Sequence, residues 1–355
     1  MDGFETPAPK RPSLEYPFGE TGPNMGETVQ VASRIEWTRM KLPFALEFIN
    51  VWIIDDEDGW TVVDTGLPLD ETRNAWKRLL GDRVTPEKPL NRVIVTHMHP
   101  DHVGTAGYLC HKYDAKLWMS RLEYTTCRLL VSDTGRDAPQ AGIDFYRAAA
   151  WTEEQIDNYK ERFGGFGRGV WRMPDAFNRL SDGDTVRMGG EDWTVIIGNG
   201  HSPEHVCLYS ESLNVVISGD QLLPRISSNV SVHPTEPTAN PLDDWISSCE
   251  KLKQSLPENV LVLPAHNTPF RGAHKRLQHL IDGHHVSLKR LSRKMTAGPI
   301  TVPETFTSLF GRAIKPDEMG MATGEALAHL NYLVKRGDIE ADLNDQGVLE
   351  YRLKA

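Results

Sequence analysis

The sequence lacks the features of an exported, disulfide-bonded or membrane-spanning protein. Its four cysteines lie far apart and form no CxxC pair, so we interpret them as buried, reduced thiols. No apolar run approaches the roughly 20 residues needed to span a bilayer, and the N-terminus has no apolar signal-peptide core. We therefore expect a cytoplasmic protein with no membrane partner.

The sequence also lacks an excess of positive charge. It has 39 Lys and Arg against 49 Asp and Glu, a formal net charge of −10, which argues against DNA or RNA as a partner without excluding a local basic pocket. An apolar content of 39% and a charged content of 25% are typical of globular domains and exclude wholesale disorder, collagen and coiled coil. A length of 355 residues predicts two or three units, or one large α/β domain with a small appendage.

The sequence does contain a series of short apolar segments typical of strands. Residues 1–27 hold five prolines and four glycines, so we expect them to form an extended arm. Strands are then predicted at 29–37, 48–55, 60–64, 92–96, 116–119, 185–188, 193–198, 207–210, 215–219 and 260–264. Helices are predicted at 68–80, 104–112, 242–256 and 272–294. Two strand-rich halves, each ending in helices, predict a layered core over residues 28–290.

Two further segments accompany this core. Residues of about 120–180 show helical patches at 121–130, 144–150 and 153–163 and end in the glycine-rich stretch 164–169, which predicts an inserted helical lid with a flexible hinge. Residues 291–355 predict a small winged-helix-like domain, because a helix at 324–335 precedes a hairpin of strands 339–343 and 348–353.

The charge of this last domain is balanced. Residues 290–355 carry nine basic and nine acidic side chains, which leaves no electrostatic footprint for nucleic acid. We expect this domain to pack against the main domain or against a second copy of the chain in a homodimer.

Thirteen histidines are the most informative feature, because they cluster. The segment THMHPDH places His97, His99, Asp101 and His102 within six residues, directly after a short apolar strand. Open α/β sheets bind their ligands at the carboxyl ends of strands, and imidazole and carboxylate groups are metal ligands. The alternative is a polar loop that is rich in histidine by chance, but the dense spacing favours a metal site on a loop.

Three more candidate ligands follow later apolar strands in the same way. His201 lies in GHSPEH, Asp220 follows VVISG, and His266 lies in PAHN. Because each comes directly after a predicted strand, we expect all of them to share one edge of the sheets with the first cluster.

The combination of HxHxDH, GHSPEH, SGD and PAH, together with Asp64 in VVDTG, resembles the metallo-β-lactamase superfamily of hydrolases. The resemblance spans about residues 28–285, with the motifs in order, and the C-terminal unit is similar to that of β-lactamase-like 2 type proteins. It implies an α+β fold: a four-layer αββα sandwich with a helical lid insertion and a small C-terminal winged-helix-like domain.

The resemblance also implies a dinuclear metal site. The implied ligands are His97, His99 and His201 for the first ion, Asp101, His102 and His266 for the second, and Asp220 as the bridging carboxylate. Asp64 is implied as a residue that orients the site. Imidazole and carboxylate donors suit two divalent ions, with zinc as the first choice and iron or manganese as alternatives.

Such a site implies hydrolysis by a hydroxide that bridges the two ions and attacks an acyl or phosphoryl centre. Asp220 and Asp101 are then the catalytic carboxylates, Asp101 as a proton shuttle to the leaving group. We predict a small-molecule acyl substrate: a thioester, ester or lactone. The alternatives are a phosphodiesterase or endoribonuclease acting on single-stranded RNA, and a non-catalytic metabolite-binding module.

Other residues near these motifs have two interpretations. Arg225, Asn229 and His233 occupy the long loop after Asp220, where they are candidates for binding an anionic substrate group or for stabilising the loop. His205 is interpreted as a supporting group rather than a ligand. The remaining histidines lie in predicted helices, as surface or interhelix polar groups.

Overall fold

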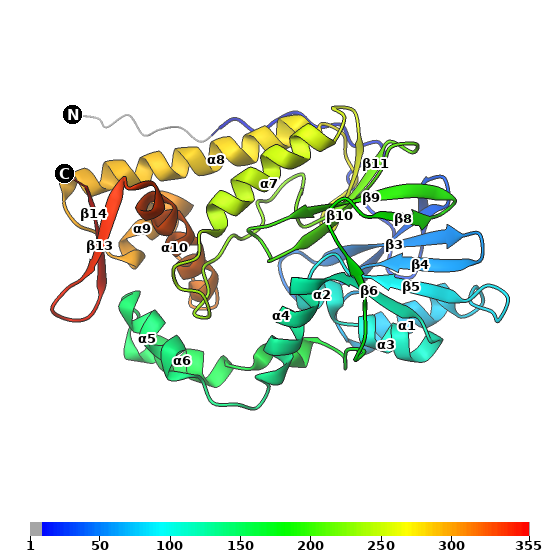
Figure 1. Ribbon diagram of the computed structural model, residues 1–355, viewed down its shortest axis with the longest axis horizontal. Coiled ribbons are helices and arrows are strands. Elements are labelled where there is room, and N and C mark those ends of the chain that lie inside the picture. Colours follow the sequence, from blue (N-terminus) through cyan, green and yellow to red (C-terminus); the bar gives the residue numbers. More distant parts are fainter. Residues whose placement is uncertain (1–8, 355) are drawn as a thin grey trace.

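The computed structural model describes residues 9–354 and contains two stacked β-sheets (Figure 1). The first sheet has seven strands in chain order: β1 (Val29–Ala32), β2 (Ile35–Lys41), β3 (Phe48–Asp56), β4 (Gly59–Val63), β5 (Leu90–Ile94), β6 (Lys116–Ser120) and β7 (Asn178–Leu180). Strands β1 to β4 are antiparallel, and β4 to β7 pair in parallel.

The second sheet has five strands in the order β12-β11-β10-β9-β8. Their bounds are β8 (Thr185–Met188), β9 (Glu191–Gly198), β10 (His205–Ser210), β11 (Val215–Gly219) and β12 (Leu261–Pro264). Only the β11–β12 pair is parallel. One buried apolar cluster joins the facing sides of the two sheets, with Ile54 and Ile94 from the first and Leu208 and Ile217 from the second.

Helices cover the outer face of each sheet. The first sheet is covered by α1 (Asp70–Leu80) and α3 (Ala106–Tyr113), whose Trp76 and Leu109 pack with strand residues in a second cluster. The second sheet is covered by α7 (Pro241–Ser255) and by α8 (Ala273–Lys294). The predicted α+β sandwich with four layers is therefore confirmed (Figure 1).

The predicted insertion contains the helices α4 (Arg121–Ser132), α5 (Gln140–Ala148), α6 (Glu153–Arg162) and the 3₁₀ helix η1 (Gly165–Gly169). It extends from the sandwich toward the C-terminal unit (Figure 1). The two are in contact, because the indole Nε1 of Trp151 donates a hydrogen bond of 2.9 Å to Thr323 Oγ1 and Ala149 belongs to the same apolar cluster as the C-terminal helices.

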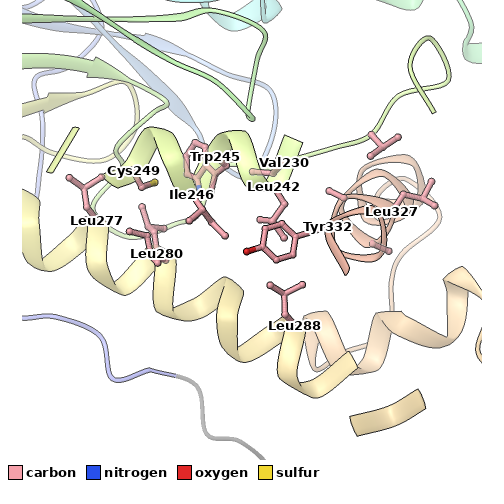
Figure 2. Packing of buried hydrophobic residues seen from close by; sticks show 14 of the residues in the cluster. Val230, Leu242, Trp245, Ile246, Cys249, Leu277, Leu280, Leu288, Leu327 and Tyr332 are labelled. Atoms are coloured by element: carbon pink, nitrogen blue, oxygen red, sulfur yellow. The ribbon is translucent and has the colours of Figure 1, made fainter. Parts of the chain in front are cut away.

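The C-terminal unit consists of η2 (Met295–Ala297), α9 (Val302–Phe310), α10 (Met319–Arg336) and the hairpin β13 (Ile339–Leu343) and β14 (Leu349–Leu353). Figure 2 shows Tyr332 of α10 between Leu242 of α7 and Leu288 of α8. The predicted helix followed by a hairpin is confirmed, and one apolar core continues from the sandwich into this unit. The exact boundaries at residues 27/28 and 290/291 stay predictions.

Three local expectations were wrong or incomplete. Residues 29–37 do not form one strand: they form β1 and β2 with a turn at Arg34, whose φ of 59° is left-handed. The helix expected at 104–112 is preceded by a separate one, α2 (Pro100–Val103), because Pro100 fixes the φ that suits a first helical position. The three-residue strand β7 was missed, since its apolar pattern is too short to detect.

The glycines expected to be a flexible hinge form η1 instead, close to the main domain. A Cβ atom on Gly169 would lie 2.9 Å from Pro100 Cβ, and one on Gly164 would lie 2.3 Å from the carbonyl oxygen of Asp133. Gly164 also has a φ of 71°. Close packing and a left-handed backbone explain these glycines.

The described part of the N-terminal arm lies along the sandwich. Glu15 forms an antiparallel bridge with Arg271, and the Arg39 guanidinium donates hydrogen bonds to the carbonyl oxygens of Gly22 and Pro23. Residues 1–8 of the predicted arm lie outside the described residues. Within 9–354, no helix is both long and apolar enough to span a bilayer.

Candidate metal centre

The candidate ligands lie at one shared edge of the two sheets, as their positions after apolar strands predict. Asp64 directly follows β4, and Asp220 directly follows β11. The sheets are joined at this edge, because the backbone N–H of Val206 in β10 donates a hydrogen bond of 2.8 Å to the carbonyl oxygen of Thr96. The strands are buried and rigid, so they hold the loops that follow them in a fixed relation.

The structure brings all seven candidate ligands into two groups. In each group, one ligand atom per residue lies within 4.8 Å of the ligand atoms of the others. The groups, named here site 1 and site 2, are His97, His99, His201 and Asp220 for site 1, and Asp101, His102 and His266 for site 2. The loop expected for the first motif is only partly a loop, because Asp101 and His102 lie on α2.

The donor atoms that face Asp220 and Asp101 have the spacing of a metal site, whereas His97 Nε2 and His99 Nδ1 lie 2.8 Å apart. His201 Nε2 lies 3.4 Å from Asp220 Oδ2, and His266 Nε2 lies 3.4 Å from Asp101 Oδ2 and 3.5 Å from Asp220 Oδ1. These distances exceed ordinary hydrogen bonds. Two ligands about 2.0–2.1 Å from one tetrahedral ion would be separated by about 3.3 Å, which the observed spacing matches.

Unpartnered buried atoms point to the same conclusion. The Nε2 atoms of His102, His201 and His266 and the Oδ1 atom of Asp220 are buried without a hydrogen-bond partner. Polar atoms are rarely left unpartnered inside a protein. The three Nε2 atoms lie 3.4–3.5 Å from the oxygens of Asp220, on the two sides of this carboxyl, so the residues fit bound cations.

Hydrogen bonds on the opposite ring nitrogen orient three of these histidines. The Nδ1 of His201 donates to the carbonyl oxygen of Asn229 at 2.7 Å, and the Nδ1 of His266 donates to the carbonyl oxygen of Phe48 at 3.0 Å. The Nδ1 of His102 lies 2.8 Å from Asp64 Oδ2. Each bond leaves Nε2 free to bind a metal, as is usual for metal-binding histidines.

Asp64, predicted to orient the site, is in contact with the first motif. It is buried with a left-handed φ of 60°, and its Oδ1 accepts a hydrogen bond of 2.9 Å from the backbone N–H of Thr96. The Thr96 hydroxyl lies 2.9 Å from Asp64 Oδ2 and 3.3 Å from His102 Nδ1. Thr96 had no predicted role, although its place beside the first histidine of the motif was a usable signal.

The electrostatics of the two sites differ. At site 1, burial and the neighbouring imidazoles hold the pKa of His97 well below its usual range and lower the pKa of His99 to about 3. At site 2, burial opposes the protonation of His102 and His266, but the carboxylates, Asp64 first for His102 and Asp220 for His266, outweigh it and raise both pKa values.

The carboxyl group between the two sites is held in its ionised form. Burial opposes the ionisation of Asp220, but His266 and His102 outweigh it and hold its pKa well below the usual range. Ionised carboxylates beside imidazoles attract a cation, which would replace the protons on His102 and His266.

His205 has the supporting position expected of it. Its Nε2 accepts a hydrogen bond of 3.0 Å from the backbone N–H of Asp220. A Cβ atom on Gly219, which has a φ of 49°, would lie 2.5 Å from the His205 ring. The glycine therefore lets the imidazole approach and hold the backbone of Asp220.

The three candidate substrate-binding residues have different surroundings. Arg225 forms an ion pair of 2.8 Å with Glu20 of the N-terminal arm, in agreement with the loop-stabilising alternative. The Asn229 side chain points to α10, where its Nδ2 donates to Glu325 Oε2 at 2.9 Å. His233 lies near His201 and keeps part of its surface exposed: desolvation by the surrounding protein, and after it His201, lower its pKa.

Comparisons with known proteins agree with this geometry. The sequence model of the family described as "Metallo-beta-lactamase superfamily" matches residues 45–266, and that of "Metallo-beta-lactamase-like, C-terminal domain" matches residues 288–354. A solved structure of a beta-lactamase domain protein from Burkholderia ambifaria superimposes with a TM-score of 0.86 at 37% identity and covers 96% of this chain and 98% of that one.

Two curated relatives are more distant. The probable metallo-hydrolase YqjP of Bacillus subtilis is 23% identical over 309 residues, which is 83% of this chain and 90% of that protein. The acyl-coenzyme A thioesterase MBLAC2 of Gallus gallus is 25% identical over 247 residues, which is 68% of this chain and 80% of that protein.

Proposed function

Because the chain belongs to the metallo-β-lactamase superfamily of metallo-hydrolases, we propose that it hydrolyses an acyl substrate, with a thioester as the first choice and an ester or lactone as alternatives. The proposal rests on the two adjoining donor groups with Asp220 between them. The relationship to an acyl-coenzyme A thioesterase supports the choice of a thioester.

Each group of residues has a part in this reaction. The residues of site 1 and site 2 would hold two divalent ions, zinc first and iron or manganese as alternatives, because their donors are imidazole and carboxylate. Such ions would supply Lewis-acid activation of water and of the scissile carbonyl. Asp220 faces both sites and keeps them close together, while His205 holds its backbone.

Asp101 is the candidate proton carrier. In the metal-free protein, burial opposes its ionisation, but His102 and His266 outweigh burial and lower its pKa. In the proposed reaction, Asp101 takes up a proton at a carboxylate oxygen and passes it to the leaving group. A thioester releases a thiolate whose ordinary pKa is near 8.5, so this leaving group depends less on proton delivery than an alkoxide does.

Three exposed apolar side chains belong to segments whose backbones contact residues around the site. Phe44, Leu122 and Met321 are 48%, 45% and 57% exposed. The Phe44 loop leads into β3, whose first carbonyl holds His266, and the Met321 carbonyl lies 3.4 Å from the Asn229 amide beside His201. Exposed apolar side chains from three segments near the ligands would suit an acyl chain.

The test is a substrate panel with purified protein reconstituted with zinc, iron or manganese. It should include short- and long-chain acyl-CoA esters, a glutathione thioester, a lactone and single-stranded RNA. We expect metal-dependent acyl hydrolysis that Asp220→Ala abolishes, because both sites lose a carboxylate oxygen. Asp192→Ala, which removes an exposed carboxylate paired with Arg187 on the β8–β9 hairpin, is the matched control.

Cleavage of RNA without acyl turnover would replace this proposal with the phosphodiesterase alternative. Acyl hydrolysis that survives in Asp220→Ala would refute the assigned site. No metal-dependent turnover of any acyl substrate would refute the proposed activity.

A further inference from the structure

A carboxylate of the inserted segment contacts both loops of site 1. Glu123 lies in the first turn of α4 and is fully buried. One of its oxygens accepts a hydrogen bond of 2.8 Å from the backbone N–H of Met98, and the other accepts one of 2.8 Å from the backbone N–H of Glu204. Met98 stands between two ligands of site 1, and Glu204 follows the third histidine by three residues. A single carboxylate therefore joins the loops that carry the three imidazoles.

The contact is reciprocal. Glu204 Oε2 accepts a hydrogen bond of 2.8 Å from the backbone N–H of Leu122. Leu122 lies in the first turn of α4, where backbone N–H groups have no partner within the helix. The carbonyl oxygen of Glu204 accepts another, of 2.7 Å, from the Ser120 hydroxyl. The start of α4 and the loop after His201 thus hold each other in place.

Burying a carboxylate is costly unless its charge is compensated. Burial raises the pKa of the Glu123 carboxyl, and the N–H groups of Glu204 and Met98 oppose that rise. Hydrogen bonds between N–H groups and an ionised carboxylate are stronger than neutral ones. Replacement of Glu123 by glutamine should therefore disrupt this contact, because the NH₂ group of the glutamine amide would face one of the two N–H donors.

Each site has its own supporting carboxylate. Asp64 contacts site 2 through His102, whereas the backbone bonds of Glu123 go to the loops of site 1. Asp64 reaches His97 of site 1 only through Thr96, whose hydroxyl lies 3.2 Å from His97 Nδ1. Glu123 is therefore the carboxylate of the insertion that contacts the site 1 loops directly.

We propose that Glu123 is a positioning residue that couples the inserted helical segment to site 1. The inference rests on the proposed metal-binding function, and it predicts that zinc binding at site 1 and ordering of α4 stabilise each other. Removal of the Glu123 carboxylate leaves the two loops free to separate, so the histidines of site 1 no longer converge.

The experiment measures zinc binding by metal-free protein, without substrate, in competition with a chromophoric chelator. Glu123→Gln is compared with wild type and with Glu153→Gln, which changes an exposed glutamate in the first turn of α6. We expect Glu123→Gln to weaken one of the two zinc-binding steps about 10- to 100-fold and to leave the other unchanged. Glu153→Gln should change neither step.

A second readout is hydrogen exchange of residues 121–132. Zinc should increase the protection of α4 in wild type and in Glu153→Gln, and should do so much less in Glu123→Gln. A role in general stability alone would weaken both zinc steps equally and leave the zinc-dependent protection of α4 in place.

The inference is overturned if Glu123→Gln binds zinc like wild type, or if both steps weaken by the same factor. Should Glu123→Gln not fold, Glu204→Ala removes the acceptor of the Leu122 N–H on the outer side of the same junction. This variant should weaken the same zinc-binding step by a smaller factor. If it left both zinc-binding steps unchanged, the inference would be overturned. Wild-type protein that binds none of zinc, iron and manganese would instead refute the proposed function, and this inference with it.

Discussion

Two regions of the protein bury histidines side by side, but only one of them has the properties of a metal centre. At the edge of the sheets, imidazoles meet carboxylates, and the Nε2 atoms of His102, His201 and His266 lack hydrogen-bond partners. Between α8 and α10, His284 and His329 instead meet each other, with 3.2 Å between His284 Nδ1 and His329 Nε2. The Nδ1 of His329 donates to the carbonyl oxygen of Glu325 at 2.8 Å, so this pair is satisfied without a cation.

The electrostatic surroundings follow the same division. Burial, and after it the neighbouring imidazoles, lower the pKa of His284 to about 3, and burial lowers that of His329 to about 4. At site 2, carboxylates overcome the effect of burial. The comparison shows that a buried histidine cluster becomes a candidate metal site when carboxylates and unpartnered nitrogens face a common point. Three predictions test it, from the largest expected effect to the smallest.

Removal of zinc should have the largest effect. One ion at a free concentration 100 times its dissociation constant stabilises the folded state by about 2.7 kcal/mol, so chelation should lower the unfolding temperature by several degrees. Thermal unfolding with and without zinc measures this shift. His329→Ala should keep the shift, because it changes only the pair in the helices. If His329→Ala lost the shift as Asp220→Ala is expected to, the two regions would not be functionally distinct.

Asp64→Asn should have the next largest effect. It removes the ionised partner of His102 Nδ1, and loss of such a supporting group typically weakens metal binding 10- to 100-fold. Asp64→Asn should weaken the zinc-binding step that Glu123→Gln leaves unchanged. The control is Asp56→Asn, a buried carboxylate at the far end of β3 that pairs with Arg92. Equal losses in both variants would show a general effect of buried carboxylates rather than support of site 2.

The smallest expected effect comes from the pair His284 and His329, which should make the free energy of unfolding depend on pH. Both folded-state pKa values lie below the usual value of 6.5, so the unfolded chain binds protons more readily, and stability falls as pH falls through about 6.5. Between pH 7 and 5.5 the loss should be about 1 kcal/mol for each histidine.

Denaturant unfolding of the metal-free protein at several pH values measures this slope. The double variant His284→Leu/His329→Leu should have a flatter slope than wild type, while His111→Asn, which changes an exposed histidine on α3, should not alter it. An unchanged slope in the double variant would mean that the pair is not buried in its neutral form.

Much of the fold could be predicted because the apolar segments are short and clearly bounded. The strands that precede the ligands and the long helix α8 have strong local patterns, and their positions agree with the prediction to within a few residues. The three-residue strand β7 has no such pattern, because it forms by pairing with β6 after the insertion. Pro100 was a local signal for α2 that the helix prediction did not use.

The supporting groups of the site were harder to predict than the candidate ligands. Glu123 resembles any acidic residue in the first turn of a helix, and its role depends on a contact with a residue 81 positions later. The Asn229 carbonyl that orients His201, 28 positions away, carries no side-chain signature at all. Such roles depend on contacts between distant segments, which local sequence patterns do not encode.

By itself, the sequence determined the chemistry of the centre: imidazoles and carboxylates placed after buried apolar strands. Only the tertiary structure decided how these donors divide into two groups, which of their nitrogens stay free, and that one carboxylate comes from the insertion. The physical reason is that residue type and spacing determine which ligands are available, whereas convergence within a few ångströms depends on how the two sheets and the insertion pack against one another.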